Sequence, residues 1–337
     1  MQAIIFKYHK LRHHVRLEKK ELAFRKTQLE KEFEVSNSDT RRLQIVNDIH
    51  HKMFLNKKLN EDLKTLFREE EAEASSLPEV TEMLRERSCC NISSFQRGQL
   101  LGSGSYGSVY VYNMGIYEIA VKEFTYTADW YTECKNYELV GESELFVRKL
   151  FVADRKIAME YSKDSTTLLD LIRTSLLSRP RILHISVHLL NAIQYLQDIG
   201  LCFGDFDPTG VLVFADDKVK LVDYGGVTLV GDTTLVRKHL YAEPSWFVDS
   251  VVSEYSDVWA FGIMVLNMLG LFPCSSVSSE RTGPAEYTLS LLDVIRDDPS
   301  SLSDPLVECL FTHIFDRQGQ YFSNDDLALM MEKFSTF

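Results

Sequence analysis

The sequence predicts an α+β domain with a small β-rich lobe and a larger helical lobe, preceded by an α-helical hairpin or coiled coil. Glycine content separates the two parts, because all 16 glycines of the 337-residue chain follow residue 85. After that point β-prone runs come first and helix-patterned stretches follow, which is typical of α+β domains. The strand candidates are 108–112 and 118–122, and the helix candidates are 182–196, 258–269 and 302–315.

The first 85 residues predict long helices, because they contain no glycine and a single proline, Pro78. Apolar residues recur at three- and four-residue steps on both sides of a turn-like segment at 34–39, although charged and polar residues interrupt both seams. The recurring positions are Leu11, Val15, Leu22, Leu29 and Phe33 in the first run, and Ile45, Ile49, Met53, Leu59, Leu63 and Leu66 in the second.

A single amphipathic helix cannot bury such a seam alone. We therefore expect protein partners at these helices, with a homo-oligomer among the candidates. The alternative is that the helices pack on the second domain and extend it. The predicted boundaries are 1–74 for the helical segment, 75–94 for a linker and 95–337 for the second domain.

Charge and composition exclude several classes of partner and location. Residues 89–337 carry 19 Lys and Arg against 33 Asp and Glu, so a nucleic-acid backbone would be repelled. The six cysteines show neither metal-ligand nor disulfide-framework spacing, which fits a reducing compartment. No apolar stretch reaches the roughly 20 residues that a membrane span needs, and the amino terminus lacks a signal-peptide pattern. We expect a cytoplasmic protein without a transmembrane segment.

A glycine-rich loop provides the first chemical signal. Gly102, Gly104 and Gly107 stand at G-x-G-x-x-G-x-V spacing ahead of Val109. Without side chains, the backbone N–H groups of such a loop can approach nucleotide phosphates. Lys122 closes an apolar run thirteen residues after Val109, where its amine is placed to reach two phosphate groups. A glycine-rich hairpin turn and a lysine reaching for solvent would give the same letters.

Four later segments make the chain resemble a protein kinase. Residues 157–162 (IAMEYS) resemble the fifth strand and hinge of that family, and 194–200 (QYLQDIG) resemble the helix end before its catalytic loop. Residues 221–225 (LVDYG) are similar to the D-F-G metal motif with Tyr for Phe, and 256–262 (SDVWAFG) to the S-D-V-W-S-F-G helix. The order and spacing agree from about residue 95 to 335, so the resemblance implies the two-lobed protein kinase-like fold.

The resemblance also implies roles for single residues in the nucleotide site. Met159 would be the gatekeeper, with Glu160 and Tyr161 in the hinge. The positions that would enclose the adenine ring are Leu101, Val109, Ala120 and Leu212. Plain core packing would place the same apolar residues there.

The resemblance also implies roles for two acidic residues: one would pair with Lys122, and the other would bind a magnesium ion. Glu133 lies eleven residues after Lys122 and would pair with it from the third helix, with Glu138 as a competitor. Asp223 would hold a magnesium ion.

The catalytic loop departs from the family pattern. Where H-R-D-L-K-P-x-N is expected, the chain reads FGDFDPTG over 203–210. Asp205 matches the residue that accepts the substrate hydroxyl proton. Phe203 and Gly204 replace the loop-bracing His and the phosphate-anchoring Arg. Asp207 replaces the γ-phosphate lysine, and Gly210 lacks the amide that holds the second metal ion.

The expected function is therefore a pseudokinase that binds ATP, holds a second magnesium ion weakly or not at all, and acts through protein contacts. An active Ser/Thr kinase is the first alternative, with Asp205 as base and with Asp207 joining Asp223 as a metal ligand, since Mg²⁺ prefers carboxylates. A solvated Asp207 without a metal role is the other interpretation of that residue. The last alternative is a helical scaffold with an empty pocket.

Overall fold

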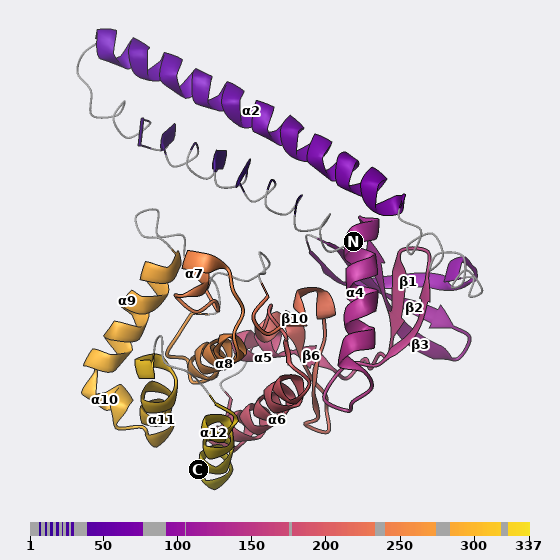
Figure 1. Cartoon of the computed structure of the whole chain (residues 1–337), viewed down its shortest axis with the longest axis vertical. Coiled ribbons are helices and arrows are strands. Elements are labelled where there is room, and N and C mark those ends of the chain that lie inside the picture. Colours follow the sequence, from indigo (N-terminus) through magenta and orange to yellow (C-terminus); the bar gives the residue numbers. More distant parts are fainter. Residues whose placement is uncertain are drawn as a thin grey trace. The chain divides into compact units, whose positions relative to one another are not determined.

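The computed structural model describes eleven helical residues between 7 and 29, and then residues 39–76, 92–104, 106–174, 177–232, 240–273, 284–317 and 323–337. The chain divides into two compact units, one of residues 1–86 with 126–128 and one of residues 87–125 with 129–337. Each unit is described by itself (Figure 1). Most of the predicted linker at 75–94 lies outside the described residues.

The first unit is built around α2 (Asp39–Ser75), an uninterrupted helix of 37 residues. No glycine or proline breaks it, which explains its length. The helical turns between residues 7 and 29 run antiparallel to it, because Lys7 Nζ lies 3.0 Å from Glu73 Oε2 and Lys19 Nζ donates to Asn60 Oδ1 at 2.6 Å. Within α2, Ile45 is fully buried and Phe54 is exposed.

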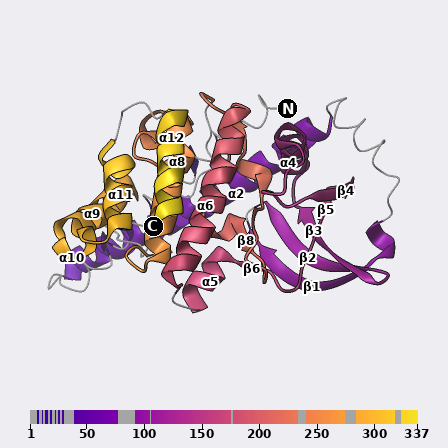
Figure 2. The same cartoon turned by 90° about the horizontal axis from the view of Figure 1, so that it is seen from below.

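The second unit begins with a five-stranded antiparallel sheet in the order β1-β2-β3-β5-β4. The strands are β1 (Gln96–Ser103), β2 (Gly107–Met114), β3 (Tyr117–Phe124), β4 (Lys149–Ala153) and β5 (Lys156–Met159). Between β3 and β4 the chain forms α4 (Thr127–Val140), which lies beside the sheet (Figure 2). The predicted β-rich lobe is thus confirmed.

The rest of the second unit is mainly helical. Its helices are α5 (Leu168–Thr174), α6 (Arg179–Asp198), α7 (Trp246–Asp249), α8 (Glu254–Met268), α9 (Pro284–Asp297), α10 (Pro299–Leu302), α11 (Pro305–His313) and α12 (Asn324–Thr336). Short strands β6 (Thr166–Thr167), β8 (Val211–Val213) and β9 (Val219–Leu221) form one sheet, and β7 (Leu201–Cys202) pairs with β10 (Thr228–Leu229).

Helix α8 forms the centre of the helical lobe. Every residue from Tyr255 to Met268 is buried, and Ser253 and Ser256 close a capping box at its start. A helix that is apolar all round is stable only inside a core, and α6 packs against it. Within the described ranges, no helix is long and apolar enough to span a membrane.

Candidate nucleotide and catalytic site

The glycine loop is the turn of the β1–β2 hairpin. Gly104 N donates to Gly107 O at 2.9 Å and closes this turn. Gly107 cannot carry a side chain, because a Cβ there would lie 2.1 Å from the backbone oxygen of Glu123. A Cβ on Gly102 or Gly104 would meet no atom within 4 Å. The loop therefore leaves open space beside the backbone of these two glycines.

Lys122 is the centre of a buried ion-pair network. Lys122 lies on strand β3 opposite Val109 of β2, and it is only 7% exposed. Its Nζ lies 2.5 Å from Glu133 Oε2 on α4 and 2.7 Å from Asp223 Oδ1. The structure thus brings together three residues that are distant in sequence, and it pairs Lys122 with Glu133 rather than Glu138.

One lysine charge is shared between two carboxylates. Burial alone would lower the pKa of Lys122, but the attraction of Glu133 and Asp223 outweighs it and raises that pKa. Burial raises the pKa of Glu133, because it is 1% exposed, while the neighbouring Asp223 charge adds to the effect. Lys122 therefore stays protonated and presents a fixed positive charge.

The segment after Asp223 is fixed in one arrangement. Asp223 adopts left-handed backbone angles, with φ 76° and ψ 78°, and starts a short 3₁₀ turn. The ring of Tyr224 is buried and stacks on Tyr137 of α4 with centroids 3.7 Å apart. Its hydroxyl donates to Val147 O at 3.0 Å, and its carbonyl accepts from Asn136 Nδ2 at 2.6 Å. These contacts keep Asp223 beside Lys122.

Helix α8 holds the start of the candidate catalytic loop, residues 203–210, by hydrogen bonds. The carboxylate of Asp257 accepts from Phe203 N at 2.5 Å and from Gly204 N at 3.1 Å. The ring of Phe203 is buried, and its centroid lies 6.4 Å from that of Tyr224. Asp205 follows directly and is half-buried. Phe203 thus fills the position of the expected histidine by apolar packing.

Gly204 meets a second glycine from the opposite loop. Its φ is +79°, and a Cβ there would lie 2.2 Å from Gly226 O. A Cβ on Gly226 would in turn lie 2.7 Å from Asp205 N. The two loops therefore approach more closely than any side chain at these positions permits. An arginine at 204 is incompatible with this backbone packing, so its absence is more than a loss of charge.

Asp207 caps the 3₁₀ turn Pro208–Gly210. Its Oδ1 accepts from Thr209 N at 2.7 Å, from Thr209 Oγ1 at 2.6 Å and from Gly210 N at 3.2 Å. The residue is 2% exposed, so the interpretation as a solvated carboxylate is wrong. The sequence D-P-T-G explains the turn, since Asp is a strong N-cap and Pro suits the first turn.

Met159 is the last residue of β5, and the hinge candidates Glu160 and Tyr161 follow it directly. Met159 is buried, lies opposite Ala120 of β3, and its sulfur accepts from Tyr137 Oη at 2.9 Å. Glu160 forms an ion pair with Lys220, whose Nζ lies 2.5 Å from Glu160 Oε1. Tyr161 is half-buried.

The remaining positions expected around the adenine ring differ in burial. Ala120 is buried, Val109 and Leu212 are half-buried, and Leu101 is 42% exposed. Their assignment to adenine contact remains a prediction.

Sequence reasoning missed three residues that position the site: Asn136, Tyr137 and Asp257. Asp257 stands inside a motif quoted above, and its carboxylate in an otherwise apolar run was the available signal. Asn136 and Tyr137 gave none, because ordinary helix positions do not reveal what they contact.

Comparison with known proteins identifies the family. The protein kinase domain profile matches residues 95–308. The chain belongs to the protein kinase family. It is 25% identical over 195 residues to the serine/threonine-protein kinase STE20 of Eremothecium gossypii, covering 50% of this chain and 19% of that protein. It is 30% identical over 118 residues to the serine/threonine-protein kinase PAK mbt of Drosophila melanogaster, covering 34% of this chain and 18% of that protein.

A third relative is the serine/threonine-protein kinase PAK 5 of Rattus norvegicus, 27% identical over 118 residues, with 34% of this chain and 16% of that protein covered. The chain therefore spans less than a quarter of the length of these relatives. The resemblance inferred from the sequence motifs is confirmed, and so is the two-lobed fold.

Proposed function

We propose that this protein kinase domain binds ATP, transfers its phosphate slowly or not at all, and acts through protein contacts. The observation that carries the proposal is the buried network of Lys122 with Glu133 and Asp223. Protein kinases use the equivalent lysine–glutamate pair to hold nucleotide phosphates. Because two carboxylates already hold the ammonium group in place, little conformational entropy is lost when it binds a polyphosphate.

The residues present fit a nucleotide. The open space beside Gly102 and Gly104 lets backbone N–H groups approach phosphate oxygens. Lys122 supplies a positive charge, and Val109 lies on the paired strand. We assign Leu101, Val109, Ala120 and Leu212 to the adenine ring, and Met159, Glu160 and Tyr161 to its hinge edge.

The residues fit one magnesium ion better than two. Mg²⁺ is commonly bound by one or two carboxylates together with substrate phosphates. The side chain of Asp223 is 52% exposed and supplies such a carboxylate. Among the described residues, no group of three His, Cys, Asp or Glu gathers into a metal site. When bound, the ion would neutralise phosphate charge.

Oδ1 of Asp207 would have to give up the hydrogen bonds of its turn to become a ligand of the second metal ion. Its Oδ1 already accepts three hydrogen bonds from Thr209 and Gly210. Gly210 offers no side-chain amide in place of the usual asparagine. We therefore assign Asp207 to the cap in the nucleotide-bound protein, whereas the active-kinase alternative requires its carboxylate to bind the second metal ion.

Phosphotransfer should be impaired for an electrostatic reason. A charge pair about 4 Å apart is worth roughly 4 kcal/mol at an effective dielectric near 20. Exchanging the catalytic-loop lysine for Asp207 removes such an attraction, and each 1.4 kcal/mol, roughly, is a tenfold change in rate. Asp205 remains as a proton acceptor, but the charge that balances the γ-phosphate is missing.

An active Ser/Thr kinase is the second candidate. The observation in its favour is the assembled ion pair between Lys122 and Glu133, together with the retained Asp205. In that case Asp205 would take the proton of the substrate hydroxyl. The STE20 and PAK relatives carry the name serine/threonine-protein kinase, and this candidate extends that activity to the present chain.

A thermal-shift titration with ATP separates these candidates. The unmodified chain should be stabilised by ATP with and without Mg²⁺, because Lys122 and the glycine loop need no metal. Lys122→Ala should weaken ATP binding by about 1 to 3 kcal/mol, the range for a charge-assisted contact. No shift at millimolar ATP would favour the scaffold with an empty pocket, and a shift that needs Mg²⁺ would favour the active kinase.

Lys156→Ala provides the matched control. Lys156 also forms a lysine–glutamate pair, 2.8 Å from Glu123 Oε1. Glu123 follows Lys122 directly in β3, so its side chain points to the other face of the sheet. This control should leave the ATP-induced shift unchanged, and an equal loss in both variants would remove Lys122 from the phosphate role.

The protein contacts are assigned to the helical unit, and we propose a cytoplasmic location. Helix α2 exposes Met53 and Phe54, 54% and 66% exposed respectively. Two large apolar side chains exposed next to each other on a long helix support a contact with another protein there.

A further inference from the structure

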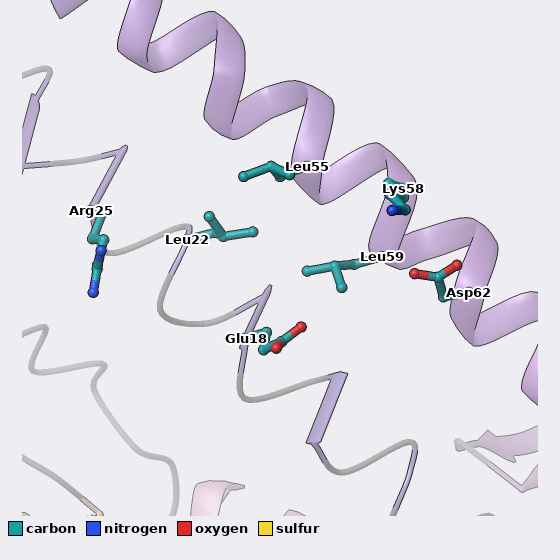
Figure 3. A pocket seen from close by; sticks show the side chains of 7 residues that line it. All are labelled: Glu18, Leu22, Arg25, Leu55, Lys58, Leu59 and Asp62. Atoms are coloured by element: carbon teal, nitrogen blue, oxygen red, sulfur yellow. The ribbon is translucent and has the colours of Figure 1, made fainter.

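A groove of about 480 Å³ runs along the helical hairpin of the first unit (Figure 3). Both antiparallel segments line it: α2 on one side, and the helical turns around residue 22 on the other. Its floor is apolar. Figure 3 shows Leu55 and Leu59 pointing from α2 toward Leu22, and all three leucines are half-buried. Covering such side chains with a further apolar surface removes them from water, which is energetically favourable.

Along both walls of the groove, an acidic residue lies toward one end and a basic residue toward the other. One wall carries Glu18 and, seven residues later, Arg25. The other carries Asp62 and, four residues earlier in the antiparallel α2, Lys58. At about 1.5 Å rise per residue, the acid and the base are separated by about 10 Å on the first wall and about 6 Å on the second. One end of the groove is therefore acidic, and charge changes to basic toward the other end.

We propose that a second copy of this chain docks on the groove in antiparallel orientation across a two-fold axis. This proposal rests on the protein contacts assigned to the helical unit above and names their partner. The rotation places Glu18 against Arg25 of the partner subunit and Asp62 against Lys58 of the partner subunit. Because a two-fold interface uses the same patch twice, each pair forms twice. The leucines of the two floors then pack against one another.

Charge order selects this occupant over other helices. In a parallel arrangement the two acidic ends would face each other, and so would the basic ends, which is destabilising. An acidic or a basic peptide would match only one end of the groove. A second copy in antiparallel orientation matches both ends and brings its own leucine floor.

The test is the oligomeric state of the full chain by light scattering and sedimentation. Arg25→Glu with Lys58→Glu makes the groove acidic throughout, and Glu18→Lys with Asp62→Lys makes it basic throughout. Each double variant alone should be monomeric, with a dimer dissociation constant raised at least about tenfold. An equimolar mixture of the two should form the dimer again. Lys57→Glu with Glu61→Lys, on exposed α2 positions that do not line the groove, should behave as the unmodified chain.

A second measurement needs no variant. Carbodiimide joins a carboxylate to a nearby amine, so mixed ¹⁴N and ¹⁵N chains should yield an isotopically mixed cross-link between Asp62 and Lys58. A monomeric unmodified chain, reversed variants that still dimerise alone, or cross-links confined to one isotope would each overturn the proposal. The ATP-induced thermal shift in the same samples reports on the nucleotide site separately, so its loss would contradict the proposed function and leave the groove standing.

Discussion

The contact between Gly204 and Gly226 makes a sharp prediction about stability. Gly204→Ala should destabilise the chain by two effects that the structure separates. The first is the left-handed backbone at φ +79°, which costs a non-glycine residue about 1 to 2 kcal/mol. The second is overlap of the new Cβ with Gly226 O at 2.2 Å, and overpacking of this kind costs about 1 to 3 kcal/mol. The sum is about 2 to 5 kcal/mol.

Gly200→Ala isolates the second effect. Gly200 has φ +73°, and a Cβ there would meet nothing within 4 Å. Both substitutions restrict the unfolded chain equally, so that contribution cancels between them. Urea unfolding followed by circular dichroism should place Gly204→Ala about 1 to 3 kcal/mol below Gly200→Ala. Equal losses in the two variants would refute the close approach of the catalytic loop to Gly226, and with it the explanation for the missing arginine.

Three further predictions concern the same site. Burial already raises the pKa of Glu133 from its ordinary 4.5 to about 7. Lys122→Ala removes the cation that holds this pKa down, so the pKa should rise further, and the variant's unfolding free energy, measured in urea, should fall more steeply than that of the unmodified chain as pH rises above 4.5; changing Glu133 to Gln as well should weaken this dependence. Tyr224→Phe keeps the ring stack but loses the 3.0 Å hydroxyl bond to a main-chain carbonyl, and should cost about 0.5 to 1.5 kcal/mol in the same assay; a neutral result would contradict that bond. Asp207→Lys with Gly210→Asn should raise ATP turnover in a phosphate-release assay more than either change alone, because both act on one phosphate group. The lost cap should lower the free energy of unfolding by about 0.5 to 2 kcal/mol. If the double variant has unchanged activity, the cause of the impaired phosphotransfer lies elsewhere.

Periodicity and composition predicted two strands and the main helices of the second unit, but not all of its elements. The run 118–122 lies within β3, and the stretch 258–269 lies almost wholly within α8. Boundaries differ where local chemistry decides them. The predicted helix at 302–315 is broken, because α10 ends at Leu302 and Asp304 caps a new helix, α11, at Pro305.

The choice between Glu133 and Glu138 lay beyond the sequence. Five residues along a helix turn a side chain by about 140°, so only one of the two can face β3. Which one does depends on how α4 is rotated against the sheet, and that is set by tertiary packing. In the structure Glu138 pairs with Lys135 at 2.9 Å on the surface, while Glu133 points inward to Lys122.

The roles of Gly204 and Asp207 could not be predicted for a related reason. The sequence showed which family residues were replaced, but not what the replacements contact. A positive φ at Gly204 and a cap formed by Asp207 depend on the path of two loops that meet only in the folded chain. Sequence reasoning therefore recorded lost charges, whereas the structure shows two backbone features that the family residues at those positions would disturb.

A single-turnover experiment tests the central claim most directly. The full chain, in excess over γ-³²P-ATP with Mg²⁺, would be filtered to measure bound nucleotide and then analysed for ADP and labelled protein in the same sample. Binding of intact ATP, with no product over many minutes and with loss of binding in Lys122→Ala, is the result expected from the buried Lys122 network and the missing γ-phosphate cation. Prompt formation of labelled protein or ADP that Asp205→Asn abolishes would contradict the account and establish an active kinase.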